Sequence, residues 1–317
     1  MKFQFLKHFR PAALIALTAA AALAQTASPA KKQFDSPQQA ASALVAATEN
    51  YSVDALLQLF GPEGKDIVST NDPVQDKNNA AAFAARARQK MRVAIDPATK
   101  AFATISVGPD AWPLPVPIVK KDGKWSFDAQ SGLEELLARR IGANELDAIQ
   151  ICRGFVEAQQ EYALAAREVT GVTQYAQKII STPGKRDGLF WRKPDGSLGG
   201  PISESVARAI EEGYSLQSRS AYHGYYFKVL KGQGAGARGG QIDYVIDGVM
   251  IGGFALIATP AEYGVTGIKT FLVNHDGVVY EKDLGKDSLS LAKAIDRFSP
   301  DKTWTRTDDN WPAESGR

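Results

Sequence analysis

The sequence predicts an α+β protein of two domains, and three patterns support that prediction. Residues 222–285 contain short runs of β-branched and aromatic residues separated by Asp-Gly pairs, which is typical of an antiparallel meander. Residues 145–167 place apolar side chains three and four positions apart, the spacing of a long amphipathic helix. The first half reads as helices followed by a small antiparallel sheet, and 317 residues suit two domains of ordinary size.

The first 24 residues have the pattern of a secretory signal peptide. Three basic residues precede an apolar run from Ala12 to Leu23, which ends in Ala-Leu-Ala at positions 22–24. The run is too short to cross a membrane, and no cysteine follows it to carry a lipid anchor. We therefore expect export to the periplasm or cell envelope, a mature chain from Gln25, and no membrane span after cleavage.

The charge balance excludes an electrostatic case for nucleic acid or an anionic membrane. The chain has 37 Lys and Arg against 35 Asp and Glu. The leader holds Lys2, Lys7 and Arg10 but no acidic residue, so the mature chain has 34 basic residues against 35 acidic ones. A near-neutral protein without long basic runs lacks the positive patch that binds phosphate backbones.

The first domain is expected to span residues 34–141, after a disordered leader at 25–33. Ser36 is placed to cap a helix that has Pro37 at its first position, and further helices are expected at about 53–59 and 78–92. A strand at 101–107 follows, and then a hairpin that joins 116–119 to 124–127 through Asp122-Gly123. Because prolines occupy positions 113, 115 and 117, the first hairpin strand is expected at a sheet edge.

The second domain is expected to span residues 144–299. Gly142 is placed to end one helix and Asn144 to cap the next, which runs to about Arg167. A second helical piece at 174–180 is expected before the loop STPGKRDG.

Five strands are then expected, and a helix at 288–298 closes the domain before a loose tail at 300–317. The expected strands are 225–230, 242–246, 249–258, 268–275 and 278–283. A two-residue turn at Asp276-Gly277 would pair His275 with Val278 and Val273 with Tyr280. These side chains would then share a face with Phe271.

Five motifs resemble a bacterial envelope family known as domain-of-unknown-function family 2950, over essentially the whole mature chain. They are GPDAWPLPVPIV at 108–119, STPGKRDGLFW at 181–191, YHGYYFK at 222–228, MIGGFALIATPAEYGVTG at 250–267 and TFLVNHDGVVYEKDLG at 270–285. The resemblance implies an envelope location and implies no particular activity.

Each half also resembles a wider fold group. The second half is similar to the globular part of type IV pilin and pseudopilin subunits, through motifs such as Gly253-Phe254, Ala258-Thr259-Pro260 and Asp276-Gly277-Val278. It departs from them because its long helix carries charges such as Glu157 and Glu161 in place of an apolar anchor. The first half resembles the nuclear-transport-factor-2-like cone, with Trp125-Ser126-Phe127-Asp128 as the matching strand.

Several patterns point toward chemistry and have simpler structural interpretations. The apparent G-x-G-x-x-G at Gly234, Gly236 and Gly239 lies between two expected strands, so a flexible hairpin loop is favoured over a dinucleotide site. Cys152 is the single cysteine and lies in the long helix, where a buried structural thiol is expected. The sequence thus predicts no cofactor.

His223 and His275 are the two histidines outside the leader, and neither has a second ligand at regular spacing, so no metal site is predicted. Arg186 could clamp a carboxylate or phosphate, whereas the simpler interpretation is an exposed turn with an internal Arg186–Asp187 pair. The remaining candidate binding residues are Tyr225, Tyr263 and Asp276, with aromatic core packing as the default for the tyrosines.

The function predicted from these patterns is a non-catalytic module that binds or assembles with another envelope protein. It depends on the absence of a catalytic signature and on the expected export. The alternative is a periplasmic hydrolase or small-ligand-binding protein, with a site near Arg186, His223 and His275 or inside the first domain. A deep cavity with converging polar groups would favour the alternative.

Overall fold

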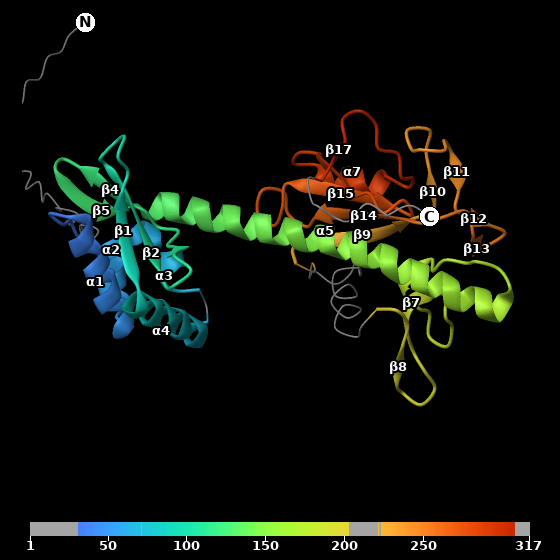
Figure 1. Cartoon of the computed structure of the whole chain (residues 1–317), viewed down its shortest axis with the longest axis horizontal. Coiled ribbons are helices and arrows are strands. Elements are labelled where there is room, and N and C mark those ends of the chain that lie inside the picture. The colour runs from blue at the N-terminus through green and yellow to red at the C-terminus, as the bar shows by residue number, and fades with distance from the viewer. Residues whose placement is uncertain (1–30, 71, 203–220, 222, 308–317) are drawn as a thin grey trace, which may run out of the picture. The chain divides into compact units, whose positions relative to one another are not determined.

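A computed structural model describes residues 31–70, 72–202, 221 and 223–307 (Figure 1). It confirms the α+β class, with helices, several antiparallel sheets and one long helix beside a meander. The chain forms two compact units that divide between Gln130 and Ser131. The expected signal peptide at 1–24 lies outside the described residues, and the more specific likenesses to nuclear-transport-factor-2-like and pilin folds stay predictions.

The first unit begins with helices whose caps match the sequence. The helices are α1 (Pro37–Glu49), α2 (Val53–Phe60), a 3₁₀ turn (Pro62–Gly64), α3 (Lys65–Val68) and α4 (Pro73–Gln89). Ser36 and Ser52 accept hydrogen bonds from backbone N–H groups in the first turns of α1 and α2, as N-caps do. The third expected helix starts earlier than 78 because Asp72 caps it and Pro73 opens it. The expected disorder of residues 31–33 is wrong, since the N–H of Lys32 donates to the carbonyl of Gln58 at 2.8 Å.

The sheet of the first unit has the order β1-β2-β4-β5, with β3 paired to β2 beside β4. Its strands are β1 (Met91–Ile95), β2 (Phe102–Val107), β3 (Trp112–Pro113), β4 (Ile118–Lys121) and β5 (Lys124–Phe127). The hairpin at Asp122-Gly123 is confirmed, with φ of 51° and 79° at its two turn residues. Strand β1 was not predicted, because its first two residues were assigned to the end of the preceding helix.

The expected edge position of β4 is wrong. β4 pairs with β2 on one side and with β5 on the other. The three prolines at 113, 115 and 117 all precede Ile118, so none of their missing N–H groups falls in the β4 ladder. The true edges are β1 and β5, and the β5 edge is covered where Phe34 and Trp125 exchange backbone hydrogen bonds of 2.8 Å.

The long helix α5 (Ala129–Thr170) is continuous over 42 residues, so the expected break at Gly142 and Asn144 is wrong. Glycine within a helix costs about 1 kcal/mol relative to alanine, which packing can offset. Downstream of Gly142, α5 buries Ala148, Cys152 and Phe155 in the core of the second unit. Asn144 does not cap a helix, because its amide donates to the carbonyl of Thr266 at 2.8 Å.

The second unit packs α5 against an antiparallel sheet of order β17-β16-β15-β14-β9 (Figure 1). Its strands are β9 (Tyr225–Leu230), β14 (Ala255–Pro260), β15 (Lys269–Asn274), β16 (Tyr280–Asp283) and β17 (Thr305–Arg306). Helix α7 (Ser288–Ala294) lies between β16 and β17 in the chain. Smaller pairs flank it: β10 (Gly232–Gln233) with β11 (Ile242–Asp243), and β12 (Val245–Ile246) with β13 (Val249–Met250). The Asp247-Gly248 turn between β12 and β13 has positive φ at both residues, as predicted.

The expected register after β15 is wrong by one residue. Leu272 pairs with Tyr280 and Phe271 with Glu281, so Val273 does not face Tyr280. Only Gly277 of the Asp276-Gly277 pair has positive φ, at 76°, which does not fit the tight two-residue turn assumed from the sequence. The connection is therefore longer, and Val279 is buried in it at 4% exposure.

Two further segments differ from expectation. Residues 174–180 do not form a helix: β6 (Lys178–Ile180) pairs in parallel with β7 (Gly188–Arg192), which also pairs with β8 (Leu198–Gly199). The tail is ordered as far as it is described, because β17 pairs with β16 and the N–H of Thr307 donates to the carbonyl of Val279. Among the helices that the structure describes, none has the length and apolar character needed to cross a membrane.

Candidate functional site

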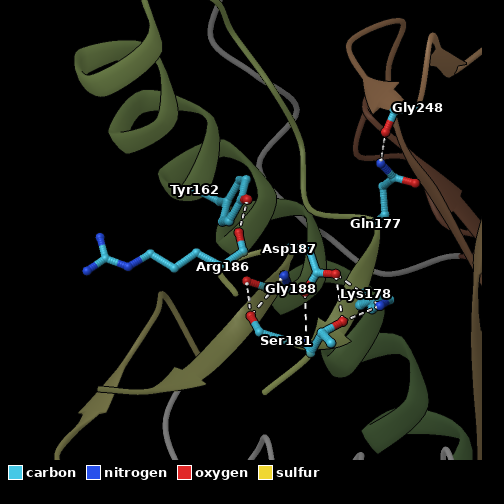
Figure 2. A network of polar contacts seen from close by, with 9 residues as sticks. Tyr162, Gln177, Lys178, Ser181, Arg186, Asp187, Gly188 and Gly248 are labelled. Carbon is cyan, nitrogen blue, oxygen red and sulfur yellow. Dashed lines mark hydrogen bonds and ion pairs between the residues drawn. The ribbon is translucent and has the colours of Figure 1, made fainter. Parts of the chain in front are cut away.

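The polar cluster at the β6–β7 connection is built around Asp187 (Figure 2). One carboxylate oxygen accepts the backbone N–H of Thr182 at 2.8 Å. The other accepts the Thr182 hydroxyl at 2.8 Å and the Lys178 ammonium at 2.9 Å. The Asp187 side chain thus joins the two ends of the loop, because it accepts a hydrogen bond from a backbone N–H group and pairs with a lysine ammonium.

These contacts set the protonation of Asp187. Partial burial alone would raise the pKa of its carboxyl group, but the hydrogen bonds from Lys178 and Thr182 outweigh it. The result is a pKa lowered from 3.8 to about 2. Asp187 is therefore ionised at neutral pH and acts as a fixed acceptor within the loop, not as a proton carrier.

A glycine and a serine allow the two strands to approach closely at this point. The N–H of Gly188 donates to the Ser181 hydroxyl at 3.0 Å, and that hydroxyl donates to the Gly188 carbonyl at 3.3 Å. A Cβ atom on Gly188 would lie 2.6 Å from the backbone of Ile180 and Ser181. Only glycine fits there, which explains its place at the end of the KRDG sequence.

The loop is also fastened to helix α5. The Tyr162 hydroxyl donates to the backbone carbonyl of Arg186 at 2.5 Å. Burial raises the pKa of the Tyr162 hydroxyl, and the charge of Asp187 raises it further. Tyr162 therefore stays protonated and acts as a hydrogen-bond donor. It fixes the backbone of Arg186 to helix α5, while Asp187 fixes the loop to Lys178 and Thr182.

The side chain of Arg186 is left outside this network and points away from it (Figure 2). Its guanidinium lies over the ring of Trp191, 5.5 Å from the ring centroid, and the residue is exposed. The expected Arg186–Asp187 pair is wrong, because Lys178 occupies the carboxylate. Within the described part of the chain, no carboxylate pairs with the Arg186 guanidinium.

The two histidines lie at opposite ends of strand β14 and do not converge on each other. His223 precedes β9 near Tyr225, which pairs with Pro260, and His275 follows Asn274, which pairs with Ala255 at the other end of β14. Six residues of strand separate these ends, a span of roughly 17 Å at ~3.3 Å per residue.

Helix α5 separates His223 from Arg186 in the same way. The Nδ1 atom of His223 contacts the carboxylate of Asp147, while Tyr162 holds Arg186. These two anchor points are roughly 22 Å apart along the helix axis at 1.5 Å per residue. A single site near Arg186, His223 and His275 is thus not formed by the second unit.

The remaining candidate residues make local contacts within the second unit. Tyr225 is buried, and its hydroxyl donates to the carbonyl of Lys269 at 2.8 Å. The Tyr263 hydroxyl contacts Asp283 at 3.2 Å on the surface. The Asp276 carboxylate lies 4.0 Å from Nε2 of His275.

The ring of His275 packs edge-on against Tyr244 and Phe254, with centroids 5.9 and 6.2 Å away. Its Nδ1 atom is buried without a hydrogen-bond partner in the described structure. Aromatic packing at the end of β15 is therefore the evident role of this side chain.

The glycine-rich segment GQGAGARGG forms a hairpin loop between β10 and β11, as predicted, but several contacts fix it. Gln233 is fully buried and its amide donates to the carbonyls of Arg238 and Gly240 at 2.9 and 2.8 Å. The Tyr244 hydroxyl donates to Oε1 of the Gln233 side chain at 2.8 Å. The expected flexibility of this loop is at odds with these bonds.

Cys152 is buried in α5, as predicted, and burial raises the pKa of its thiol to about 12. A thiol with this pKa is not a nucleophile at neutral pH. Among the residues that the structure describes, no three His, Cys, Asp or Glu side chains come together as metal ligands.

Sequence reasoning found Arg186 and Asp187 but missed the residues that define their roles. Lys178, Thr182 and Tyr162 carry no motif, because they reach the loop through the parallel pairing of β6 and β7 and through the packing of α5. Trp191 had one available signal: it lies within STPGKRDGLFW, where an aromatic residue follows a basic loop, and its side chain is half-buried in the structure.

Comparison with known proteins places the whole described chain in one family. Neither a curated protein sequence nor a solved structure matches the chain. A family model described as "Protein of unknown function (DUF2950)" matches residues 31–307, which include both compact units. This protein therefore belongs to the DUF2950 family.

Proposed function

We propose that this protein is an exported, non-catalytic binding module, and that the β6–β7 loop with Arg186 and Trp191 is its contact surface for an acidic segment of another envelope protein. The observation that carries the proposal is that the acidic residue of the loop is paired within the loop, whereas the adjacent arginine is not paired with an acid in the part of the chain that the structure describes. Asp187 is fully engaged by Lys178 and Thr182, whereas the neighbouring guanidinium of Arg186 has no carboxylate partner among the described residues.

The loop geometry is that of a preorganised anchor. Arg186 is fixed at its backbone by Tyr162, and its guanidinium rests on an aromatic ring. A side chain that is already positioned loses less conformational entropy on binding. Arginine and tryptophan are also enriched among the few residues that dominate binding energy at protein interfaces. A carboxylate of the partner can accept two parallel hydrogen bonds from the guanidinium in this arrangement.

The distribution of the polar residues supports binding over hydrolysis. A hydrolase needs a nucleophile or activated water, a base and an orienting group within hydrogen-bond reach. His223 is separated from His275 along β14 and from Arg186 along α5, and Asp187 is held ionised by its own loop. Export is supported by the leader pattern alone, and mass spectrometry of the mature N-terminus tests it, with Gln25 as the expected first residue.

The binding proposal is tested by photo-crosslinking in the native envelope. A photo-reactive residue replaces Lys193, an exposed position on the turn beside β7. Capture is compared for the otherwise unchanged chain, Arg186→Ala, Arg186→Lys and the control Lys185→Ala, which removes a neighbouring exposed cation. We expect one reproducible partner, crosslinked through an acidic segment.

Affinity for that partner should fall by about 30-fold or more in Arg186→Ala, the effect of truncating a hot-spot residue. Arg186→Lys should lose an intermediate amount because lysine cannot form the paired hydrogen bonds. Lys185→Ala should bind like the unchanged chain. Equal capture by Arg186→Ala, or no partner while a known envelope complex crosslinks in the same sample, would rule the proposal out.

A further inference from the structure

Strand β1 forms an edge of the sheet in the first unit that no other described strand covers. Within the described chain β1 pairs with β2 alone, and it ends the strand order β1-β2-β4-β5. The opposite edge, β5, is covered by Phe34, which exchanges backbone hydrogen bonds with Trp125. Natural sheets protect their edges with lysines, prolines, bulges or covering segments. β1 has the sequence MRVAI and carries one charge and no proline.

The backbone groups on this edge can be assigned from the ladder with β2. The N–H of Asp96 donates to the carbonyl of Phe102 at 2.8 Å, and the carbonyl of Lys90 accepts the N–H of Gly108 at 2.9 Å. In an antiparallel pair, hydrogen-bonding groups alternate between the partner strand and the opposite side. Even-numbered residues of β1 therefore face β2 with their backbone groups, and odd-numbered residues face outward.

Three consecutive outward positions thus offer both a donor and an acceptor. These are Met91, Val93 and Ile95, and no hydrogen bond to their outward groups is found within the described chain. Their side chains continue the buried face of the sheet, because they pair with Val107, Ile105 and Ala103, each of which is fully buried. At the edge this apolar face becomes accessible, with Met91 37% and Ile95 42% exposed.

We propose that β1 is a self-association edge, at which a second copy of this chain adds its own β1 in antiparallel orientation around a two-fold axis at Val93. This goes beyond the proposed contact loop, which lies in the other unit, and depends on different residues. The five residues are self-complementary in this register: Met91 lies opposite the partner's Ile95, and Val93 opposite the partner's Val93. All outward backbone groups then pair, and two apolar faces become one.

The charge and the chain neighbours of β1 select this register. A two-fold axis at Arg92 would place two arginines directly opposite each other, which is destabilising. An axis at Ala94 would place Pro97, which has no N–H, opposite Met91. With the axis at Val93, Arg92 lies opposite the partner's Ala94 on the outer face, where it meets no like charge.

Sedimentation velocity of the mature chain, over a wide range of concentrations, tests the proposal. We expect a monomer–dimer equilibrium. Val93→Pro should give a monomer at every concentration: it removes an N–H that faces outward and leaves the ladder with β2 intact, as prolines at edge strands do. Circular dichroism and the thermal midpoint show whether this variant keeps its fold.

A second pair of variants tests the register without touching the backbone. Ala94 is exposed, so neither change should disturb the monomer. Ala94→Glu places a carboxylate opposite the partner's Arg92 and should tighten the dimer, whereas Ala94→Lys should weaken it by about fivefold through two like-charge pairs.

The proposal is overturned if the unchanged chain sediments as a monomer throughout. It is overturned equally if folded Val93→Pro still dimerises, or if the two Ala94 variants shift the dimer constant in the same direction.

Discussion

Replacing Asp187 by Asn tests whether this carboxylate holds the β6–β7 loop. Its pKa is lowered from 3.8 in the unfolded chain to about 2 in the folded one. At 1.36 kcal/mol per pKa unit, this difference corresponds to about 2.4 kcal/mol. The Asp187 side chain is 32% exposed, so solvent screening reduces the estimate to roughly 1–2 kcal/mol.

The sign of the pH dependence follows from the direction of the shift. Because the folded pKa is the lower one, the stabilisation is fully present above 3.8 and is lost as the pH falls through about 2. Near pH 3, roughly half of it should remain. Asparagine cannot ionise, so Asp187→Asn should lack this pH-dependent term entirely.

Urea unfolding followed by circular dichroism, at a series of pH values, measures the effect. At pH 6 Asp187→Asn should be less stable than the unchanged chain, and the two should approach each other as the pH falls. Asp195→Asn is the matched control, because Asp195 is an exposed turn residue that accepts hydrogen bonds from Ser197, which also lower the pKa of its carboxyl group. Solvent screens this exposed carboxylate, so its loss should change the pH profile less than the loss of Asp187.

Two results would refute this reasoning about Asp187. One is a stability difference between the two chains that stays constant from pH 6 down to pH 3. The other is an Asp187→Asn variant as stable as the unchanged chain at pH 6, which would mean that Lys178 and Thr182 gain as much from water as from the carboxylate.

Two other buried groups give sharp expectations. Gln159 is fully buried and exchanges two hydrogen bonds of 2.8 Å with the backbone of Ala176, so Gln159→Leu should lower the free energy of unfolding by about 2–4 kcal/mol. The adjacent exposed Gln160→Leu should change it by less than about 0.5 kcal/mol in urea unfolding, and equal effects would contradict the role of the buried amide. Because the Cys152 thiol has a pKa of about 12, iodoacetamide should modify it in urea but not in the native protein near neutral pH, and fast native labelling would contradict its burial.

Local chemistry made parts of the fold predictable. Ser36 and Pro37 define the start of α1 because a side-chain acceptor and a fixed φ act within one turn of chain. The hairpin at Asp122-Gly123 and the turn at Asp247-Gly248 were predictable for the same reason, since few residue pairs adopt positive φ twice. The family was predictable because long contiguous motifs carry it.

Features decided by tertiary contacts were not predictable. Gly142 is a poor helix residue, yet α5 continues through it because the helix gains core burial farther along. The register after β15 follows the packing of Val279 rather than the Asp276-Gly277 pair, which looks like a tight turn in isolation. In the same way, Asp187 is the nearest acid to Arg186 in the sequence. The parallel pairing of β6 and β7 nevertheless places Lys178 beside Asp187, and Lys178 forms the ion pair.

The two proposed surfaces have one feature in common: at both, strong interaction groups find no partner among the residues that the structure describes. In the second unit, one acid takes up a lysine and a backbone N–H, and the adjacent guanidinium stays available on an aromatic platform. In the first unit, one sheet edge is closed by Phe34 while the other keeps outward donors and acceptors at alternate residues. Exposed donors and acceptors cost a folded chain little free energy while they are hydrogen-bonded to water. They contribute to binding when the groups of a partner replace that water. A dimer formed through β1 has two cationic contact loops, one from each copy. If both loops bind the same partner assembly, the apparent affinity rises through effective concentration without any new contact.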